Sequence, residues 1–135
     1  MDLEASVQRI LDRGKNLADL FYCVFLDRYP ELRRHFTAVD LSHQAALLTM
    51  ALQVIAEHHL RHSPAAAEYL LVLGHRHHAW GIELDEFPKF RDCLLDTLQQ
   101  FHGQDWNDEL ARQWRAAIDE AIDTMRAGYA EPHTP

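Results

Sequence analysis

The sequence contains little cysteine and little lysine. Its two cysteines, Cys23 and Cys93, suit a reducing cytosol and do not imply a disulfide framework. Lysine occurs only at Lys15 and Lys89, and the 21 acidic residues outnumber the 13 basic residues, for a net charge of -8. Because nucleic-acid binding requires clustered Lys and Arg, that class of function is excluded.

The chain also lacks long hydrophobic runs. No segment carries about 18 uninterrupted apolar residues, so no transmembrane helix is predicted. The N-terminal residues Met-Asp-Leu-Glu have neither the basic region nor the apolar core of a signal peptide. These absences predict a cytoplasmic protein without a membrane partner, and the length predicts a single domain.

Helical periodicity runs along almost the whole chain, and no strand pattern interrupts it, which predicts an all-α fold of about seven helices. We place the domain at residues 1–129 and a disordered tail, with Pro132 and Pro135, at residues 130–135. Caps, glycines and prolines set the boundaries. The predicted helices run from Asp2 to before Gly14, from about Asn16 to before Pro30, from Pro30 to about His35, from about Leu41 to His62, from about Pro64 to Ala79, from Pro88 to before Gly103, and for about twenty residues after a cap at Asp105 or Asn107.

Ten histidines are many for this length, and histidine is the commonest metal ligand. Three of them lie in the segment Leu-Gly-His-Arg-His-His-Ala-Trp-Gly-Ile at 73–82. His77 shares the apolar stripe of its helix with Leu70 and Leu73, and Gly81 is suited to end that helix. The spacing alone leaves two interpretations open: a metal ligand, or a core histidine satisfied by a hydrogen bond, which is the commoner case.

Two further residues point to the same pocket. His43 lies on the apolar stripe of the helix from Leu41, with Leu47 one turn later, and Phe36 ends a turn that starts at a proline. An all-α domain with two inward histidines on neighbouring helices, and aromatics between them, suits a flat apolar cofactor with a metal at its centre. Haem is such a cofactor, because a neutral imidazole binds its iron on one face.

At these residues the sequence resembles the globin superfamily, in particular single-domain bacterial globins and the globin domain of flavohaemoglobins. The resemblance covers nearly the whole chain, and no single motif carries it alone. The matching segments, in order, are Phe21-Tyr22, Pro30-Glu31, Phe36, His43-Gln44-Ala45-Ala46-Leu47, Leu73-Gly74-x-x-His77-x-x-x-Gly81-Ile82, and Pro88 followed by Asp92-Cys93-Leu94-Leu95.

The resemblance implies a globin fold with a short first helix and no separate D helix, around a pocket for haem b. His77 is then the proximal iron ligand, and its other ring nitrogen is expected to bond the Leu73 carbonyl. Tyr22 is expected to donate a hydrogen bond to a diatomic ligand, and Phe36 to pack on the porphyrin. The residues expected to contact haem are Tyr22, Phe36, His43, Leu47, Leu73, His77, Ile82, Phe87, Phe90 and Leu94.

His43 has two implied roles. It is expected either to donate a hydrogen bond to the ligand or to bind the iron itself as a displaceable distal ligand. Gln44 is a weaker rival for the polar role, because it lies roughly 100° round the helix. Leu47 is expected to set the distal volume. The connection 37–42 is shorter than is usual in the family.

Two positions depart from flavohaemoglobin-type globins. Phe87 stands where those proteins have a proximal Tyr, and Tyr129 falls about where they have a Glu. The implied consequence is a weaker electronic push from the proximal histidine.

Several functions remain open. The first is a globin that reversibly binds O2, NO or CO, as a monomer or weak homodimer. An enzyme is the second: a nitric oxide dioxygenase that works with a separate reductase, or a globin with a peroxidase-like side activity. A haem gas-sensor domain of a larger protein is the third. A di-iron helical bundle is disfavoured, because the inward carboxylates it needs are missing, and His58 and His62 are expected to decorate an exposed helix end.

Overall fold

The computed structural model describes residues 1–130 and the side chains of residues 1–129. The described chain is helical throughout and contains no strand. The elements are α1 (Leu3–Asp12), α2 (Asn16–Arg28), the 3-10 helix η1 (Pro30–Phe36), α3 (Leu41–Arg61), α4 (Pro64–Ala79), the 3-10 helix η2 (Leu84–Glu86), α5 (Phe87–His102), the 3-10 helix η3 (Gly103–Asp105) and α6 (Asp108–Ala130). The all-α prediction is confirmed, and the seven predicted helices correspond to the six α-helices and η1.

Some boundaries differ from the prediction by one residue, and the helix predicted to end at His62 ends at Arg61. The helix predicted from Pro88 begins one residue earlier, at Phe87, directly after η2. The predicted tail begins at residue 130, but Ala130 is the last residue of α6. The remainder of that predicted tail, 131–135, lies outside the described residues.

Side-chain caps explain where several helices begin. Asp2 Oδ1 accepts a hydrogen bond from the Ala5 amide at 2.8 Å, and Asp40 Oδ1 accepts one from the Ser42 amide at 3.0 Å. Each cap satisfies an amide that has no partner within its helix. Gly81, at φ +83°, follows α4 in the left-handed conformation that glycine tolerates best. The cap at Asp2 and the stop at Gly81 are therefore as predicted from the sequence.

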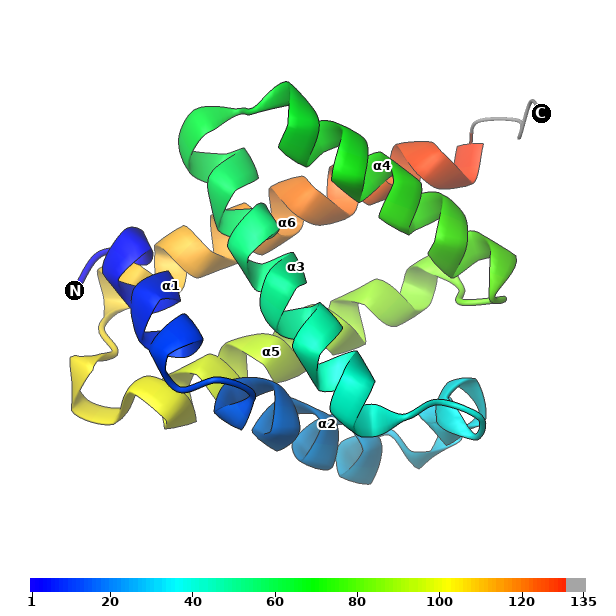
Figure 1. The fold of residues 1–135 in the computed structure, drawn as a ribbon, viewed down its shortest axis with the longest axis horizontal. Helices are drawn as coiled ribbons and strands as arrows, with labels where there is room; N and C mark the ends of the chain where they lie inside the picture. Colours follow the sequence, from blue (N-terminus) through cyan, green and yellow to red (C-terminus); the bar gives the residue numbers. More distant parts are fainter. Residues whose placement is uncertain (131–135) are drawn as a thin grey trace.

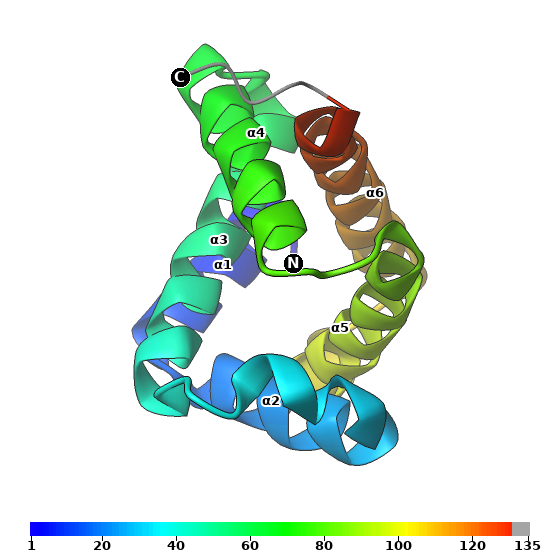
Figure 2. The ribbon, with the colours of Figure 1, turned by 90° about the vertical axis from the view of Figure 1, so that its right-hand side faces the viewer.

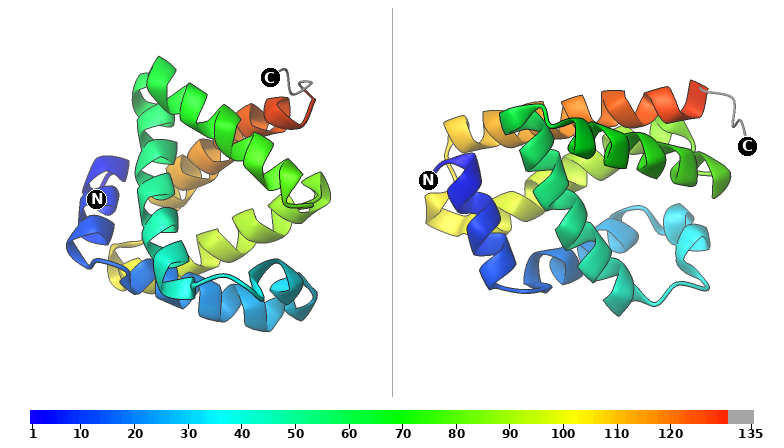
Figure 3. Two further views of the ribbon diagram at one scale, coloured as in Figure 1. Left: turned by 45° about the vertical axis from the view of Figure 1, so that its right-hand side comes forward. Right: turned by 45° about the horizontal axis from the view of Figure 1, so that its top comes forward.

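The helices enclose the core from several directions. In Figure 1, α3 crosses in front of α5 and α6. Figure 2 shows α3, α4, α5 and α2 arranged around a central region. In Figure 3, the left-hand view shows α4 crossing α6 and the right-hand view shows the two helices next to each other; they form the largest helix–helix contact of the described chain.

The α4–α6 contact depends on two glycines. A Cβ added to Gly74 would lie 2.1 Å from the Met125 carbonyl oxygen, and one added to Gly128 would lie 2.6 Å from the Leu71 carbonyl oxygen. The two backbones therefore cross without intervening side chains. Because His77 lies three residues after Gly74, this crossing fixes the position of the segment that carries the candidate ligand.

One buried polar cluster joins α1 to α5 and α6. The Trp114 indole donates to Ser6 Oγ at 2.9 Å, and Ser6 Oγ lies 2.6 Å from His102 Nε2. Because Ser6 Oγ accepts a hydrogen bond from the indole N–H, the Ser6 hydroxyl can donate its own hydrogen bond to a neutral His102 ring. Burial, followed by the charge of Arg9, lowers the pKa of His102 to about 4, and Asp105 opposes the shift.

The face of α3 that packs on other helices is formed by Ala45, Leu48 and Leu52. His43 and Leu47, which are expected to line the cofactor pocket, lie off this face and have exposed side chains, Leu47 by 39%. Apolar residues occur all round this helix, so its periodicity did not determine the direction that packs on its neighbours.

Within residues 1–130, no single helix is long and apolar enough to cross a membrane. Only η1 and α3 taken together pass that test of length and composition, and they are bent by 99°.

Candidate functional site

His77 lies in the last turn of α4, and its ring is held in one tautomer. Nδ1 lies 2.8 Å from the Leu73 carbonyl oxygen. A carbonyl can only accept, so Nδ1 carries the proton and Nε2 keeps a free lone pair. Burial lowers the pKa of His77, although the bond to Leu73 opposes this shift. The expected Leu73 bond is confirmed, and His77 is a neutral imidazole suited to ligate a metal.

Aromatic rings surround His77. The Phe87 ring stacks on it at a centroid distance of 6.0 Å, and the Trp80 ring lies at 5.5 Å. Tyr129 packs edge-on against Phe87 at 5.9 Å and donates its hydroxyl proton to the Ile82 carbonyl at 2.7 Å. The Tyr129 hydroxyl thus donates to the backbone after α4, and His77 Nδ1 donates to the Leu73 carbonyl.

The ionisation of Tyr129 follows from this environment. Burial raises the pKa of Tyr129 to about 12, and the negative charges of Glu86 and Glu83 add to the rise. Tyr129 therefore remains a protonated donor at neutral pH. Sequence analysis linked this position to a carboxylate in related globins, and the structure shows a phenol that anchors the loop instead.

Tyr22 in α2 is a second buried polar group, with 7% of its surface exposed. Its ring packs edge-on against Phe36 at 5.6 Å, and the Gln44 side chain lies close enough to its hydroxyl to affect its pKa. Burial raises the pKa of Tyr22 to about 12, and Gln44 opposes the shift. The phenol therefore keeps its proton. An open cavity of about 620 Å³, lined also by Leu26 and Leu41, reaches Tyr22 from the surface.

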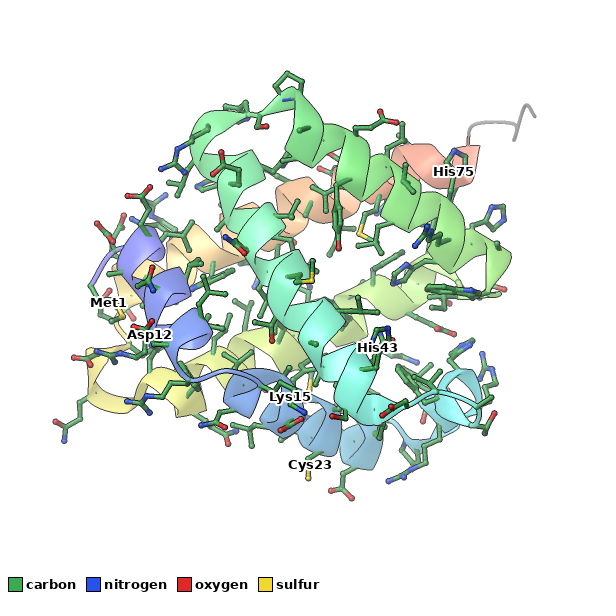
Figure 4. The ribbon with its side chains drawn as sticks, viewed as in Figure 1. Met1, Asp12, Lys15, Cys23, His43 and His75 are labelled. Carbon is green, nitrogen blue, oxygen red and sulfur yellow. The ribbon has the colours of Figure 1, made fainter. Side chains whose placement is uncertain are left out.

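The structure places His43 and Gln44 differently. His43 lies in the first turn of α3, where its amide faces the Asp40 carboxylate at 3.4 Å and its side chain is exposed. Figure 4 shows the His43 ring beside the N-terminal turns of α3, while Cys23 points outward from α2. Gln44, the weaker rival in the sequence analysis, is the residue in contact with Tyr22.

The remaining candidate residues divide by burial. Phe36, Leu73, Ile82 and Phe90 are partly exposed, as expected of side chains at the edge of a site. Phe87 and Leu94 are buried in the core cluster. The structure thus brings Phe87 to His77 and Phe36 to Tyr22, whereas Leu94 is part of the buried core.

Three residues near the site were missed or undervalued. Gln44 was ranked below His43 because the position of α3 about its own axis was not known. Trp80 is 59% exposed. It lies three residues after His77, a spacing that indicates that both side chains are on one face of the helix. Glu86 is a buried carboxylate in η2, and no residue pattern around it indicated its burial.

The other histidines among the described residues do not form a second site. His58 Nε2 lies 3.5 Å from Thr124 Oγ1, and His62 is exposed at the end of α3. No group of three or more His, Cys, Asp or Glu among residues 1–130 is arranged to hold a metal.

Comparison with known proteins identifies the family. The family model described as Globin matches residues 19–125, which include Tyr22, His43 and His77. The chain belongs to the globin family. The resemblance stated from the sequence is confirmed.

Individual relatives agree with this assignment. This globin is 29% identical to a neuroglobin of Chaenocephalus aceratus over 102 residues, which are 76% of the chain and 58% of that protein. It is 24% identical to a flavohemoprotein of Bacillus cereus over 131 residues, which are 96% of the chain and 32% of that protein. The chain therefore matches only about a third to three fifths of the length of these curated relatives.

A solved structure shows the same fold. The bacterial globin of Campylobacter jejuni superposes with a TM-score of 0.79 at 18% identity, covering 96% of this chain and 95% of that one. The predicted globin fold is confirmed by this match.

The residues of the site fit the haem that the family implies. The fit rests on the chemistry of the donors: a neutral imidazole with Nε2 free, aromatic rings beside it, and a protonated phenol elsewhere in the site. A flat apolar macrocycle with a central metal needs this combination of apolar walls and one nitrogen ligand.

Proposed function

We propose that this globin binds haem b through His77 and reversibly binds O2 or another diatomic gas, NO or CO. The observation that carries the proposal is the His77 tautomer, with Nδ1 fixed on the Leu73 carbonyl at 2.8 Å. That bond orients the ring and leaves Nε2 as the ligand. Haem, when bound, supplies the iron at which a diatomic gas binds.

Tyr22 gives this site its selectivity among gases. The phenol is buried and protonated, so it is a hydrogen-bond donor for a ligand with partial negative charge, such as O2. A buried hydrogen bond of this kind is worth about 1.5–3 kcal/mol. The Gln44 side chain lies near this hydroxyl and lowers its pKa, against the larger effect of burial.

His43 has its own role in the proposal. We propose it as a distal iron ligand that a gas displaces, from its exposed position in the first turn of α3. The ferrous spectrum without added gas distinguishes the states: sharp, split visible bands mean six-coordinate iron, and one broad band means five-coordinate iron. If His43→Ala leaves sharp, split bands unchanged, His43 is not the ligand.

The central experiment is spectroscopic. The purified protein is expected to be red, with an intense Soret band and a ferrous spectrum that shifts with CO. Replacement of His77 with Ala removes the nitrogen ligand and is expected to lower haem retention strongly. The matched control is His78→Ala on the same turn, which is expected to retain haem. A colourless wild-type protein after haem supplementation contradicts the proposal, and an unchanged spectrum for His77→Ala contradicts the ligand assignment.

A second candidate function is nitric oxide dioxygenation with a separate reductase. The match to a flavohemoprotein over 96% of the chain favours it, as does the Tyr22 donor. The bond from Tyr129 to the Ile82 carbonyl weighs against it, because no carboxylate then strengthens the donor power of His77. Rapid mixing of the O2-loaded protein with nitric oxide is the test, and slow or absent nitrate formation excludes this function.

A further inference from the structure

A single buried carboxylate, Glu86 in η2, lies beside the site and has no role in ligand binding as described above. It is only 9% exposed, whereas Asp and Glu are almost never buried unless paired. Arg34 Nη2 lies 3.1 Å from its Oε1, and His35 Nε2 lies 3.4 Å from its Oε2. Arg34 donates a hydrogen bond to Glu86. His35 lies within ion-pair distance of Glu86, but the two do not have the geometry of a hydrogen bond.

Both partners of Glu86 come from η1. Arg34 lies 52 positions before Glu86 in the sequence. Arg34 is itself fixed there, because its Nη1 donates to the Glu31 carbonyl at 3.0 Å. The main helical neighbour of η1 is α2. The Glu86 cluster, defined as Glu86, Arg34 and His35, therefore ties η1 to the corner between α4 and α5.

The residues next in sequence to this cluster are walls of the site. Phe36 follows His35 and packs on Tyr22 at 5.6 Å. Phe87 follows Glu86 and stacks on His77 at 6.0 Å. One carboxylate thus connects the segment that carries the aromatic ring beside Tyr22 to the segment that carries the ring beside His77.

We propose that Glu86 is a positioning residue that clamps η1 to the α4–α5 corner and so keeps Phe36 and Phe87 at the spacing that retains haem. The inference rests on the proposed haem-binding function. Glu86 acts through Arg34 and His35 and does not itself touch the iron. Breaking the clamp lets η1 move away from the corner and opens the edge of the site.

The test measures haem loss from the loaded protein to an excess of a haem-free acceptor globin, followed by the Soret band. Glu86→Ala is expected to lose haem about tenfold faster, the effect of one charge-assisted hydrogen bond. Glu86→Gln keeps an acceptor for Arg34 without the charge, so its rate should fall between the two. Arg34→Met should approach the rate of Glu86→Ala, and the double variant should be no faster than Glu86→Ala alone.

Two controls separate the clamp from general effects. Asp96→Ala removes the ion pair with Arg28, at 2.8 Å and on the exposed side of α5, and should leave haem loss within about twofold of wild type. Ile10→Val lowers stability in the core of α1 and should also leave haem loss unchanged. Urea unfolding of each haem-free variant supplies the stability against which the rates are compared.

The outcomes distinguish this inference from the proposed function. A wild-type protein that holds no haem overturns both. A protein that holds haem, but whose Glu86→Ala and Arg34→Met variants lose it no faster than Ile10→Val at equal stability, overturns the clamp alone. If Glu86→Ala does not fold, Glu86→Gln and Arg34→Met carry the same comparison.

Discussion

Replacement of Gly74 with Ala tests whether the close crossing of α4 and α6 positions the candidate iron ligand. The added Cβ would lie 2.1 Å from the Met125 carbonyl oxygen and 2.8 Å from the Met125 carbonyl carbon and Cα. All three atoms belong to the backbone of α6, so no flexible side chain can move aside. The two helices must separate locally by about 1 Å to reach an ordinary contact distance.

The net cost follows from two opposing effects. Overpacking of a tight contact costs about 1–3 kcal/mol, and a clash with backbone falls at the upper end of that range. Ala in a helix interior gains about 1 kcal/mol over Gly. We therefore expect Gly74→Ala to lower the free energy of unfolding by about 2 kcal/mol. Because His77 lies three residues further along α4, haem loss should also become faster.

The assay pairs urea unfolding with transfer of haem to a haem-free acceptor. Gly14→Ala is the matched control, because Gly14 also has a positive φ of +62° but has no atom within 4 Å of an added Cβ. It should cost about 1–2 kcal/mol of stability through its backbone conformation and leave haem loss unchanged. If Gly74→Ala is as stable as wild type and retains haem equally well, the crossing does not position His77.

Two further predictions concern single polar groups. Tyr22→Phe removes the buried donor and should lower O2 affinity about ten- to a hundredfold, mainly through faster O2 dissociation measured by stopped-flow replacement with CO, while CO affinity changes little; equal O2 affinities would remove Tyr22 from the ligand site. The folded-state pKa of His102, about 4, lies below its ordinary value of 6.5, so the native state binds fewer protons and stability falls as pH falls through this range. About 3 kcal/mol of stability is lost as the pH falls from 6.5 to 4, and His102→Gln should flatten the urea-unfolding profile over that range; a profile as steep as that of wild type would assign the acid sensitivity to other groups.

The proximal side of the site could be predicted from the sequence because it is local. His77 and Leu73 are one helical turn apart, so the bond between them follows from helix geometry once the helix is recognised. Gly81 and Pro64 mark the ends of that helix by their backbone chemistry. These features need no information from distant parts of the chain.

The distal side could not be predicted in the same way. Whether His43 or Gln44 meets Tyr22 depends on the rotation of α3 about its axis, and apolar residues on several faces of α3 leave that rotation undetermined. Consecutive residues lie about 100° apart around a helix, so a rotation of α3 by that angle would put one of these two side chains where the other lies.

The sequence by itself determined the all-helical class, most helix boundaries and the hydrogen bond between His77 and Leu73, because each follows from local backbone preferences and from neighbours within one turn. Only the tertiary structure decided which face of α3 is buried, that Gly74 and Gly128 meet at the crossing of α4 and α6, and that Glu86 pairs with Arg34. Those contacts join residues about 50 or more positions apart. Their geometry is set by how whole helices pack, and the spacing of residues along the chain contains no measure of that packing.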